Sequence, residues 1–101
     1  MKNYKLVRDK IPEIIRKKGL KPITHAASKK EYETRLREKL VEESKEFQKS
    51  GENEELADIL EVINAIIKTK KTTIKKIEKI RKQKRKERGS FGKKIILKIN
   101  R

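Results

Sequence analysis

Two pairs of carboxylates near the middle of the chain have the types and spacing needed to bind a metal ion. Glu43 and Glu46 form one pair, and Glu55 and Asp58 form the other. The members of each pair are three residues apart, which places them on the same side of a helix turn. The chain has 31 Lys and Arg against 15 Asp and Glu, so a local surplus of acid needs a reason. Four oxygen ligands from two helices suit a hard cation such as Mg²⁺.

The first pair lies on a long helix expected from Lys29 to about Lys49. Ser28 begins a capping box, the signature of a helix start, and Gly51 ends the helix. The apolar stripe of this helix lacks one member, at the position of Glu43, and its other members are Tyr32, Leu36, Leu40 and Phe47. A buried, unpaired carboxylate costs several kcal/mol. We therefore expect Glu43 to face either a cation or an opening into a cleft.

The second pair lies on a helix expected from Asn53 to about Lys68, which has a wide apolar face. On a helical wheel, Glu55 and Asp58 border this face. The connection around Gly51 is short, which makes the two helices antiparallel neighbours. All four carboxylates then lie at the same end of a helical hairpin, near enough to share an ion.

The remaining sequence predicts flanking elements. A short helix is expected from Pro12 to Lys18, capped by Asp9 and ended by Gly19. Thr72 or Thr73 caps another helix that runs to about Glu87. Residues 95–99 read as a strand that pairs with the extended segment 21–27. The predicted fold is all-α, an antiparallel helical hairpin with flanking helices and a small two-stranded β ribbon.

Composition sets further limits. The 101 residues predict one domain, residues 1–101, and only 33% of them are hydrophobic. We therefore expect a bundle completed by oligomerisation, as a homodimer or homotetramer. There are no cysteines, so disulfides and thiolate metal sites are excluded. With no apolar run long enough to span a bilayer and no apolar signal region, the expected location is the cytoplasm, without a membrane partner. The net charge of +16 favours anionic partners.

With these residues in view, the chain resembles the MazG-like, all-α nucleoside triphosphate pyrophosphohydrolases. The ExxE and ExxD pattern of that family matches Glu43-Ser-Lys-Glu46 and Glu55-Leu-Ala-Asp58. The opening Tyr4-Lys-Leu-Val-Arg-Asp-Lys-Ile-Pro12 and the closing Arg88-Gly-Ser-Phe-Gly-Lys-Lys-Ile95 are similar to motifs of its house-cleaning subgroup, which is related to phosphoribosyl-ATP pyrophosphohydrolase. The gap between the two pairs is shorter than is usual across the broader superfamily.

The resemblance implies Mg²⁺-dependent hydrolysis of nucleoside triphosphates, non-canonical ones among them, to monophosphate and pyrophosphate, with Mn²⁺ as an alternative ion. It assigns Glu43, Glu46, Glu55 and Asp58 to the metal. Glu43 and Glu46 are the catalytic candidates, and which carboxylate serves as the base stays open. The candidates for holding the substrate phosphates are Arg8, Lys10, Arg88 and Lys93, with the first two favoured.

Three alternatives remain open at this point. The acidic pairs could be solvated helix residues that form salt bridges with Lys39, Lys45 and Lys49. The cationic run 81–88 could belong to a small basic nucleic-acid-binding protein, although aromatic residues make up only 4% of the chain. The substrate could also be phosphoribosyl-ATP, which requires the same chemistry.

Overall fold

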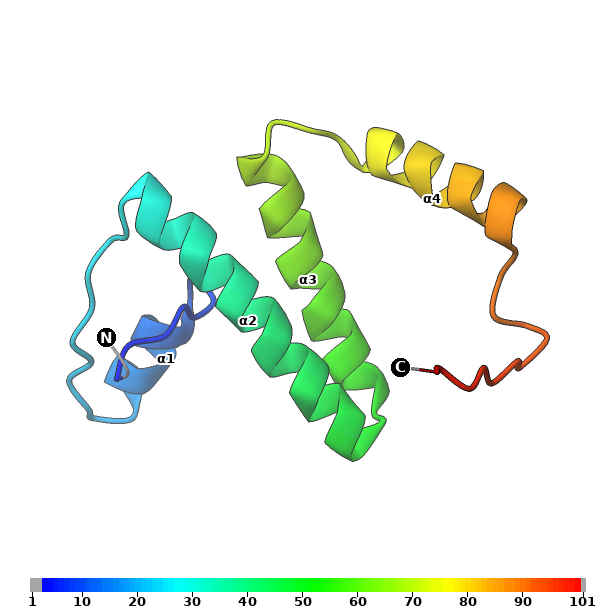
Figure 1. The fold of residues 1–101 in the computed structure, drawn as a ribbon. Coiled ribbons are helices and arrows are strands. Elements are labelled where there is room, and N and C mark those ends of the chain that lie inside the picture. Colours follow the sequence, from blue (N-terminus) through cyan, green and yellow to red (C-terminus); the bar gives the residue numbers. More distant parts are fainter. Residues whose placement is uncertain (1–2, 101) are drawn as a thin grey trace.

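The computed structural model of this chain describes residues 3–100, which form four helices and no strand. Figure 1 shows them in chain order: α1 (Ile11–Lys17), α2 (Lys29–Ser50), α3 (Asn53–Thr69) and α4 (Ile74–Arg88). The all-α prediction is therefore confirmed. The molecule is elongated, with extents of 52 × 32 × 29 Å. Within residues 3–100, no helix combines the length and the apolar character needed to cross a membrane.

The centre of the fold is the hairpin of α2 and α3. The Ser28 hydroxyl accepts a hydrogen bond from the Glu31 amide at 3.2 Å and so caps the start of α2. Gly51 ends α2 in a left-handed conformation, φ 66°, which favours a residue without a Cβ. Among the described residues, α2 and α3 are the one pair of helices that pack extensively. The predicted antiparallel hairpin is confirmed.

The core between these helices is small. Leu36 from α2 and Val62 and Ile67 from α3 are the buried hydrophobic residues of the described chain. Leu36 is 2% exposed, the lowest value among them. Because so little apolar surface is removed from water, each buried side chain contributes a large share of the stability of the hairpin.

The flanking helices begin differently from each other. Thr73, and not Thr72, caps α4, because its hydroxyl accepts a hydrogen bond from the Lys76 amide at 3.2 Å. The predicted cap of α1 by Asp9 is wrong: the cap position is Lys10, which makes no side-chain cap hydrogen bond. Pro12 in the first turn needs no amide partner, so α1 can start without a side-chain cap.

The predicted β ribbon is also absent from the described chain. Residues 21–27 and 95–99 contain no strand, and Figure 1 shows them at opposite ends of the molecule. The physical reason is the direction of α4, which carries residues 95–99 away from residues 21–27. An isolated pair of strands is marginally stable in water, and here no helix surface supports one.

We predict that Leu36→Ala strongly destabilises the hairpin, because it leaves a cavity between α2 and α3. Loss of a buried Leu side chain typically lowers the free energy of unfolding by roughly 2–5 kcal/mol. Chemical denaturation followed by circular dichroism measures the change. The matched control is Leu20→Ala, because Leu20 is 63% exposed and loses little packing. Equal effects of the two substitutions would contradict this description of the core.

Candidate carboxylate site

Glu43 is buried in the seam between α2 and α3, where the gap in the apolar stripe predicted it. The residue is 7% exposed, and no other charged residue of the described chain is buried. Its Oε1 lies 3.4 Å from the Lys39 ammonium, one turn earlier on α2. Its Oε2 is buried without a hydrogen-bond partner. Burial removes the water around this oxygen, and no protein donor replaces it. A bound cation would supply the missing partner.

The electrostatic surroundings of Glu43 favour its neutral form. Burial raises the pKa of the Glu43 carboxyl above its ordinary value. The hydrogen bond from Lys39 opposes this shift, and the negative charge of Glu46 adds to it. The raised pKa means that one Lys39 ammonium does not fully compensate the buried carboxylate.

The other three predicted metal ligands lie around this seam with different partners. Glu46 is exposed on α2, one turn beyond Glu43, and the two carboxylates interact. Glu55 is half-buried at the start of α3 and accepts a hydrogen bond from the Ser50 hydroxyl at 2.6 Å. Asp58 is half-buried one turn later and accepts from the Arg8 guanidinium at 2.8 Å. The predicted positions of Glu55 and Asp58 at the border of the packing face are confirmed.

These carboxylates are not gathered into one ready-made cluster. Within residues 3–100, no three acidic or His side chains lie close enough together to hold a metal ion in this arrangement. Glu43 and Glu46 form a pair on α2, whereas the carboxylates of Glu55 and Asp58 are turned to their own hydrogen-bond donors. The assignment of all four to one ion stays a prediction.

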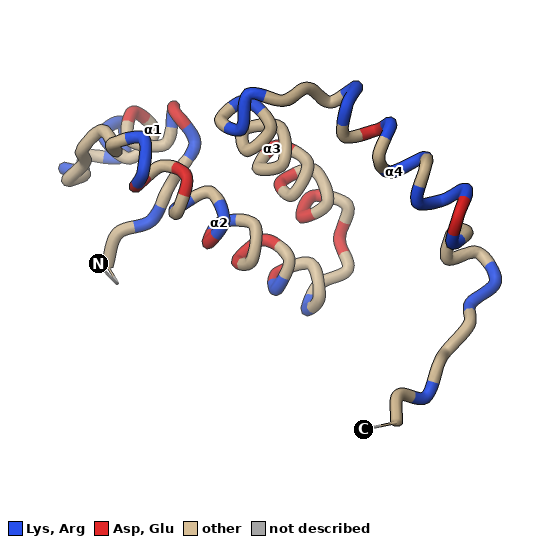
Figure 2. Tube along the Cα trace, turned by 45° about the horizontal axis from the view of Figure 1, so that its top comes forward, with Lys and Arg blue, Asp and Glu red and all other residues tan. Residues whose placement is uncertain are grey.

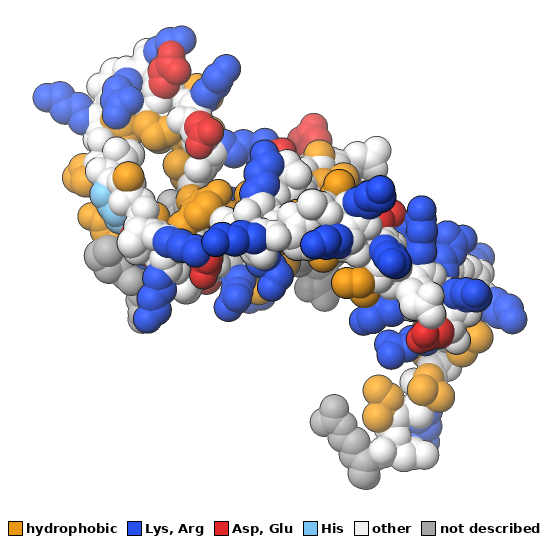
Figure 3. Space-filling model, turned by 90° about the horizontal axis from the view of Figure 1, so that it is seen from above, with side chains coloured by type: hydrophobic (Ala, Val, Ile, Leu, Met, Phe, Trp, Pro, Cys, Tyr) orange, Lys and Arg blue, Asp and Glu red, His pale blue; other side chains and the backbone are white. Residues whose placement is uncertain are grey.

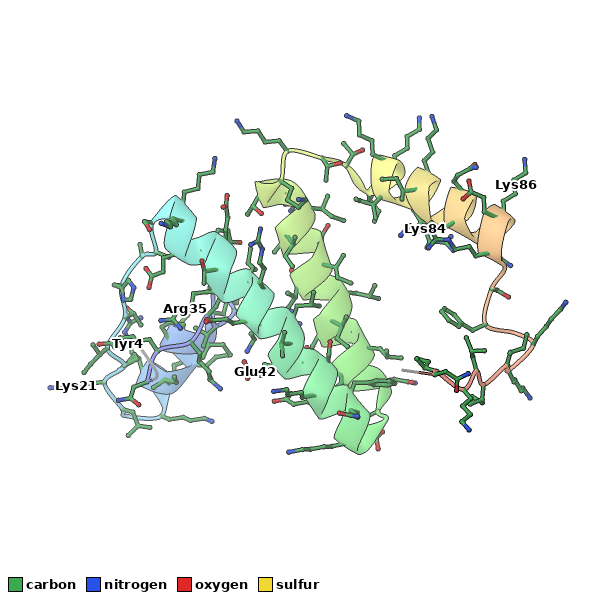
Figure 4. All side chains as sticks on the ribbon, viewed as in Figure 1. Tyr4, Lys21, Arg35, Glu42, Lys84 and Lys86 are labelled. Carbon is green, nitrogen blue, oxygen red and sulfur yellow. The ribbon has the colours of Figure 1, made fainter. Side chains whose placement is uncertain are left out.

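The N-terminal segment lies along the acidic side of the hairpin. Arg8 reaches Asp58 on α3, and the Lys5 ammonium is 3.7 Å from a carboxylate oxygen of Glu42 on α2. Figure 4 shows Glu42 on the side of α2 that faces the N-terminal segment and α1. The sequence suggested Arg8 as a phosphate ligand but gave no sign of these contacts, because they join residues far apart in the chain. We call Glu42, Glu46 and Asp58 the acidic edge.

In the described chain, the remaining predicted phosphate ligands form no ion pair with the acids of this edge. Lys10 is exposed at the start of α1. Arg88 ends α4, and Lys93 follows it in the exposed C-terminal segment, which Figure 1 shows beyond α3. The structure therefore brings one of the four predicted cations, Arg8, into contact with a predicted metal ligand.

Salt bridges within α2 account for part of the acidic surplus. Lys39 pairs with Glu42 at 3.5 Å as well as with Glu43. In the described residues, Glu42 and the four predicted metal ligands form no ion pair with Lys45 or Lys49. The lone His25 hydrogen-bonds to Glu31 at 3.0 Å, and its ring meets the ring of Tyr4. Ordinary ion pairing thus explains Glu42, but it does not explain Oε2 of Glu43.

Two hollows of the surface do not include the four predicted metal ligands. One, of about 510 Å³, is an open groove on α2 lined by Leu40, Val41, Ser44, Lys45 and Gln48. Another, of about 550 Å³, lies between the N-terminal segment, residues 22–27 and the start of α2. Neither is lined by any of the four predicted metal ligands.

Comparisons of this chain with protein-family models, with curated proteins and with solved structures return no match. The family resemblance accordingly rests on the motifs quoted above.

We predict a pH-dependent difference in stability between the wild type and Glu43→Gln. The raised pKa means that the folded chain binds this proton more tightly than the unfolded chain. The resulting stabilisation is full below the unfolded pKa, about 4.3. It is lost as pH rises through the folded pKa. The neutral amide of Gln does not titrate, so the wild type should lose stability relative to this variant as pH rises toward 7.

Urea unfolding in the presence of EDTA, from about pH 4 upward, measures this difference. Glu52→Gln removes the same charge from an exposed position just before α3 and controls for the change in net charge. A difference between wild type and Glu43→Gln that stays constant with pH would contradict the prediction.

Proposed function

We propose that this chain is a Mg²⁺-dependent nucleoside triphosphate pyrophosphohydrolase, which releases monophosphate and pyrophosphate. The observation that carries the proposal is the buried Glu43 carboxylate, whose Oε2 has no partner and which lies beside Glu46. This observation supports a cation at the seam, and the motif resemblance supplies the reaction. Non-canonical nucleotides are the proposed substrates.

The donor set suits the proposed ion. Carboxylate oxygens are the ligands that Mg²⁺ and Mn²⁺ accept, and this chain has no thiolate to favour a softer metal. Glu43, Glu46, Glu55 and Asp58 would hold the ion. When bound, it supplies charge neutralisation on the substrate phosphates.

The side chains of the protein supply the rest of the reaction. A carboxylate of the Glu43 and Glu46 pair orients a water molecule and accepts its proton. The water oxygen forms a bond to phosphorus, the α–β phosphoanhydride bond breaks, and its electron pair leaves with pyrophosphate. Arg8 is the first candidate for gripping phosphate oxygens, since a guanidinium can donate two parallel hydrogen bonds. Lys10 follows it in the same segment, while Arg88 ends α4 and Lys93 lies in the segment after that helix.

A homodimer or homotetramer is part of the proposal. The described chain buries only three hydrophobic residues, while several large apolar side chains of α2 and α3 stay partly exposed. A second copy would cover some of this surface and complete a helical bundle.

We predict Mg²⁺-dependent release of pyrophosphate from at least one member of a triphosphate panel that includes phosphoribosyl-ATP. Glu43→Ala and Asp58→Ala should each lower kcat/KM by at least about 100-fold, because each removes a proposed ligand. Mg²⁺ should also raise the Tm of the wild type and not that of Glu43→Ala.

The matched control for the panel is Glu52→Ala, an exposed acid just before α3 that makes no side-chain cap hydrogen bond, which should keep full activity. Retained Mg²⁺-dependent hydrolysis in both Glu43→Ala and Asp58→Ala would remove the assignment of these residues. Absence of hydrolysis across the whole panel would argue against the reaction itself.

A second candidate function, binding of nucleic acid, is favoured by the charge of α4. Lys75, Lys79, Lys82 and Lys86 follow helical spacing along one side of this exposed helix. Figure 2 shows basic residues along most of α4, and Figure 4 shows Lys86 pointing away from α3. Phosphates spaced along a strand suit such a row of ammonium groups.

If this candidate is correct, RNA or DNA should bind at physiological salt, with a log–log salt slope that becomes less steep when the four lysines are changed to Gln. Changing Lys29, Lys30, Lys45 and Lys49 of α2 to Gln gives a control with the same net charge. Fluorescence anisotropy measures both. Binding that disappears above low salt, or equal effects of the two variants, would reject this candidate.

A further inference from the structure

The exposed side of α3 combines apolar and acidic residues. Leu56 and Leu60, one turn apart, are 44% and 66% exposed. Glu54 and Glu61 of the same helix are also exposed. In all, α3 carries four acids, Glu54, Glu55, Asp58 and Glu61, against the single cation Lys68. On the helical wheel, Leu56 and Leu60 lie on one flank of this exposed side, and Glu54 and Glu61 lie about 100–160° away on the other flank. We call these four residues the α3 face.

The chain after α3 has the opposite character. Residues 70–101 contain 15 Lys and Arg against two Glu. Figure 2 shows basic residues recurring through α4 and the segment after it, which we together call the arm, residues 74–100. Glu78 is paired with Arg81 at 2.8 Å, and Glu87 accepts a hydrogen bond from Gln83. The arm therefore presents almost uncompensated positive charge to whatever it meets.

The arm also exposes several large apolar side chains. Its end carries Phe91 at 99% exposed and Ile96 at 95%, with further large apolar side chains at Ile95, Leu97 and Ile99. Figure 3 shows hydrophobic side chains, coloured orange, exposed at this end of the molecule. Ile74 and Ile80 of α4 are more than half exposed. Several large apolar side chains exposed on one segment are typical of an interaction site.

The arm makes no polar attachment to its own hairpin. Within the described chain, the hydrogen bonds and ion pairs of residues 74–100 join residues of that same segment or its cap, Thr73. The link between α3 and α4 is closed by backbone hydrogen bonds, from the Lys70 amide to the Ile66 carbonyl and from the Thr72 amide to the Ile67 carbonyl. These bonds direct α4 away from α3 of the same chain, as Figure 1 shows.

We propose that the arm of one copy of this chain docks on the α3 face of a second copy, and that the exchange is reciprocal. Leu56 and Leu60 receive the apolar side chains of residues 91–99, and the acids of α3 meet the lysines and arginines of the arm. Residues 95–99 follow the turn that the Lys94 amide closes on the Phe91 carbonyl. They span roughly 17 Å when extended, so they fit along α3, which is about 25 Å long. In a dimer with a twofold axis, this contact forms twice, so each arm packs on the α3 face of the other copy.

This proposal deepens the homo-oligomer of the proposed function by naming its contact, and it does not depend on hydrolysis. The first measurement is the mass of the full chain in solution, by light scattering after a high-salt wash and nuclease treatment. The wild type should be dimeric. Leu60→Asp and Ile96→Asp should each weaken the dimer at least ten-fold, with helix content unchanged. Ile23→Asp, at an 85% exposed apolar residue outside the arm, should leave it dimeric.

Cysteine cross-linking identifies the contact, since the chain has no cysteine of its own. Leu60→Cys and Ile96→Cys chains of different tag length are mixed and oxidised. The proposal expects a disulfide between the two different chains. In the Leu60→Cys, Ile96→Cys double variant, the disulfide should join two chains.

Four outcomes would overturn the proposal. A monomeric wild type would contradict both the proposed arm contact and the proposed homo-oligomer. A dimer that cross-links only Leu60→Cys to Leu60→Cys retains the homo-oligomer but places hairpin against hairpin. An internal disulfide in a monomeric double variant shows the arm on its own α3. Loss of the dimer upon nuclease treatment shows that nucleic acid holds the copies together.

Discussion

The carboxylate of Glu43 is the group around which α2 and α3 have to pack. It occupies a position of the α2 stripe that helical spacing would assign to a core side chain, and one of its oxygens is buried without a partner. A hairpin whose hydrophobic core consists of Leu36, Val62 and Ile67 has little stability to spare for an uncompensated charge. The seam is thus both the structural centre of the molecule and the place where a carboxylate oxygen is buried without a hydrogen-bond partner.

Local sequence signals predicted the helices well because their causes are local. Ser28, Gly51 and Thr73 act on hydrogen bonds within one or two turns, and each ends or begins a helix close to where the sequence placed it. The burial of Glu43 was predictable for the same reason, since helical periodicity alone locates it. Asp9 failed as a cap because α1 begins at Ile11, which puts Lys10 and not Asp9 at the cap position.

Longer-range features could not be predicted in this way. The contact of Arg8 with Asp58 depends on how the N-terminal segment crosses the hairpin, which no local pattern encodes. The ribbon of residues 21–27 and 95–99 failed because strand propensity says nothing about the direction in which α4 carries the chain. Spacing placed the four carboxylates on neighbouring turns correctly, yet the orientation of Glu55 and Asp58 depends on the donors Ser50 and Arg8.

The distribution of charge connects the seam with the arm. Residues 29–69 hold 11 of the 15 acids, whereas residues 70–101 hold 15 of the 31 cations. A chain this basic would repel its own copies if the charge were spread evenly, but separation into an acidic hairpin and a basic arm turns the same charge into an attraction between unlike parts. The acids of α3 can then act on both sides of one helix. Glu55 and Asp58 border the seam. Glu54 and Glu61 lie on one flank of the exposed side of α3, and Leu56 and Leu60 lie on the other, so a basic and apolar segment lying along this side can contact both.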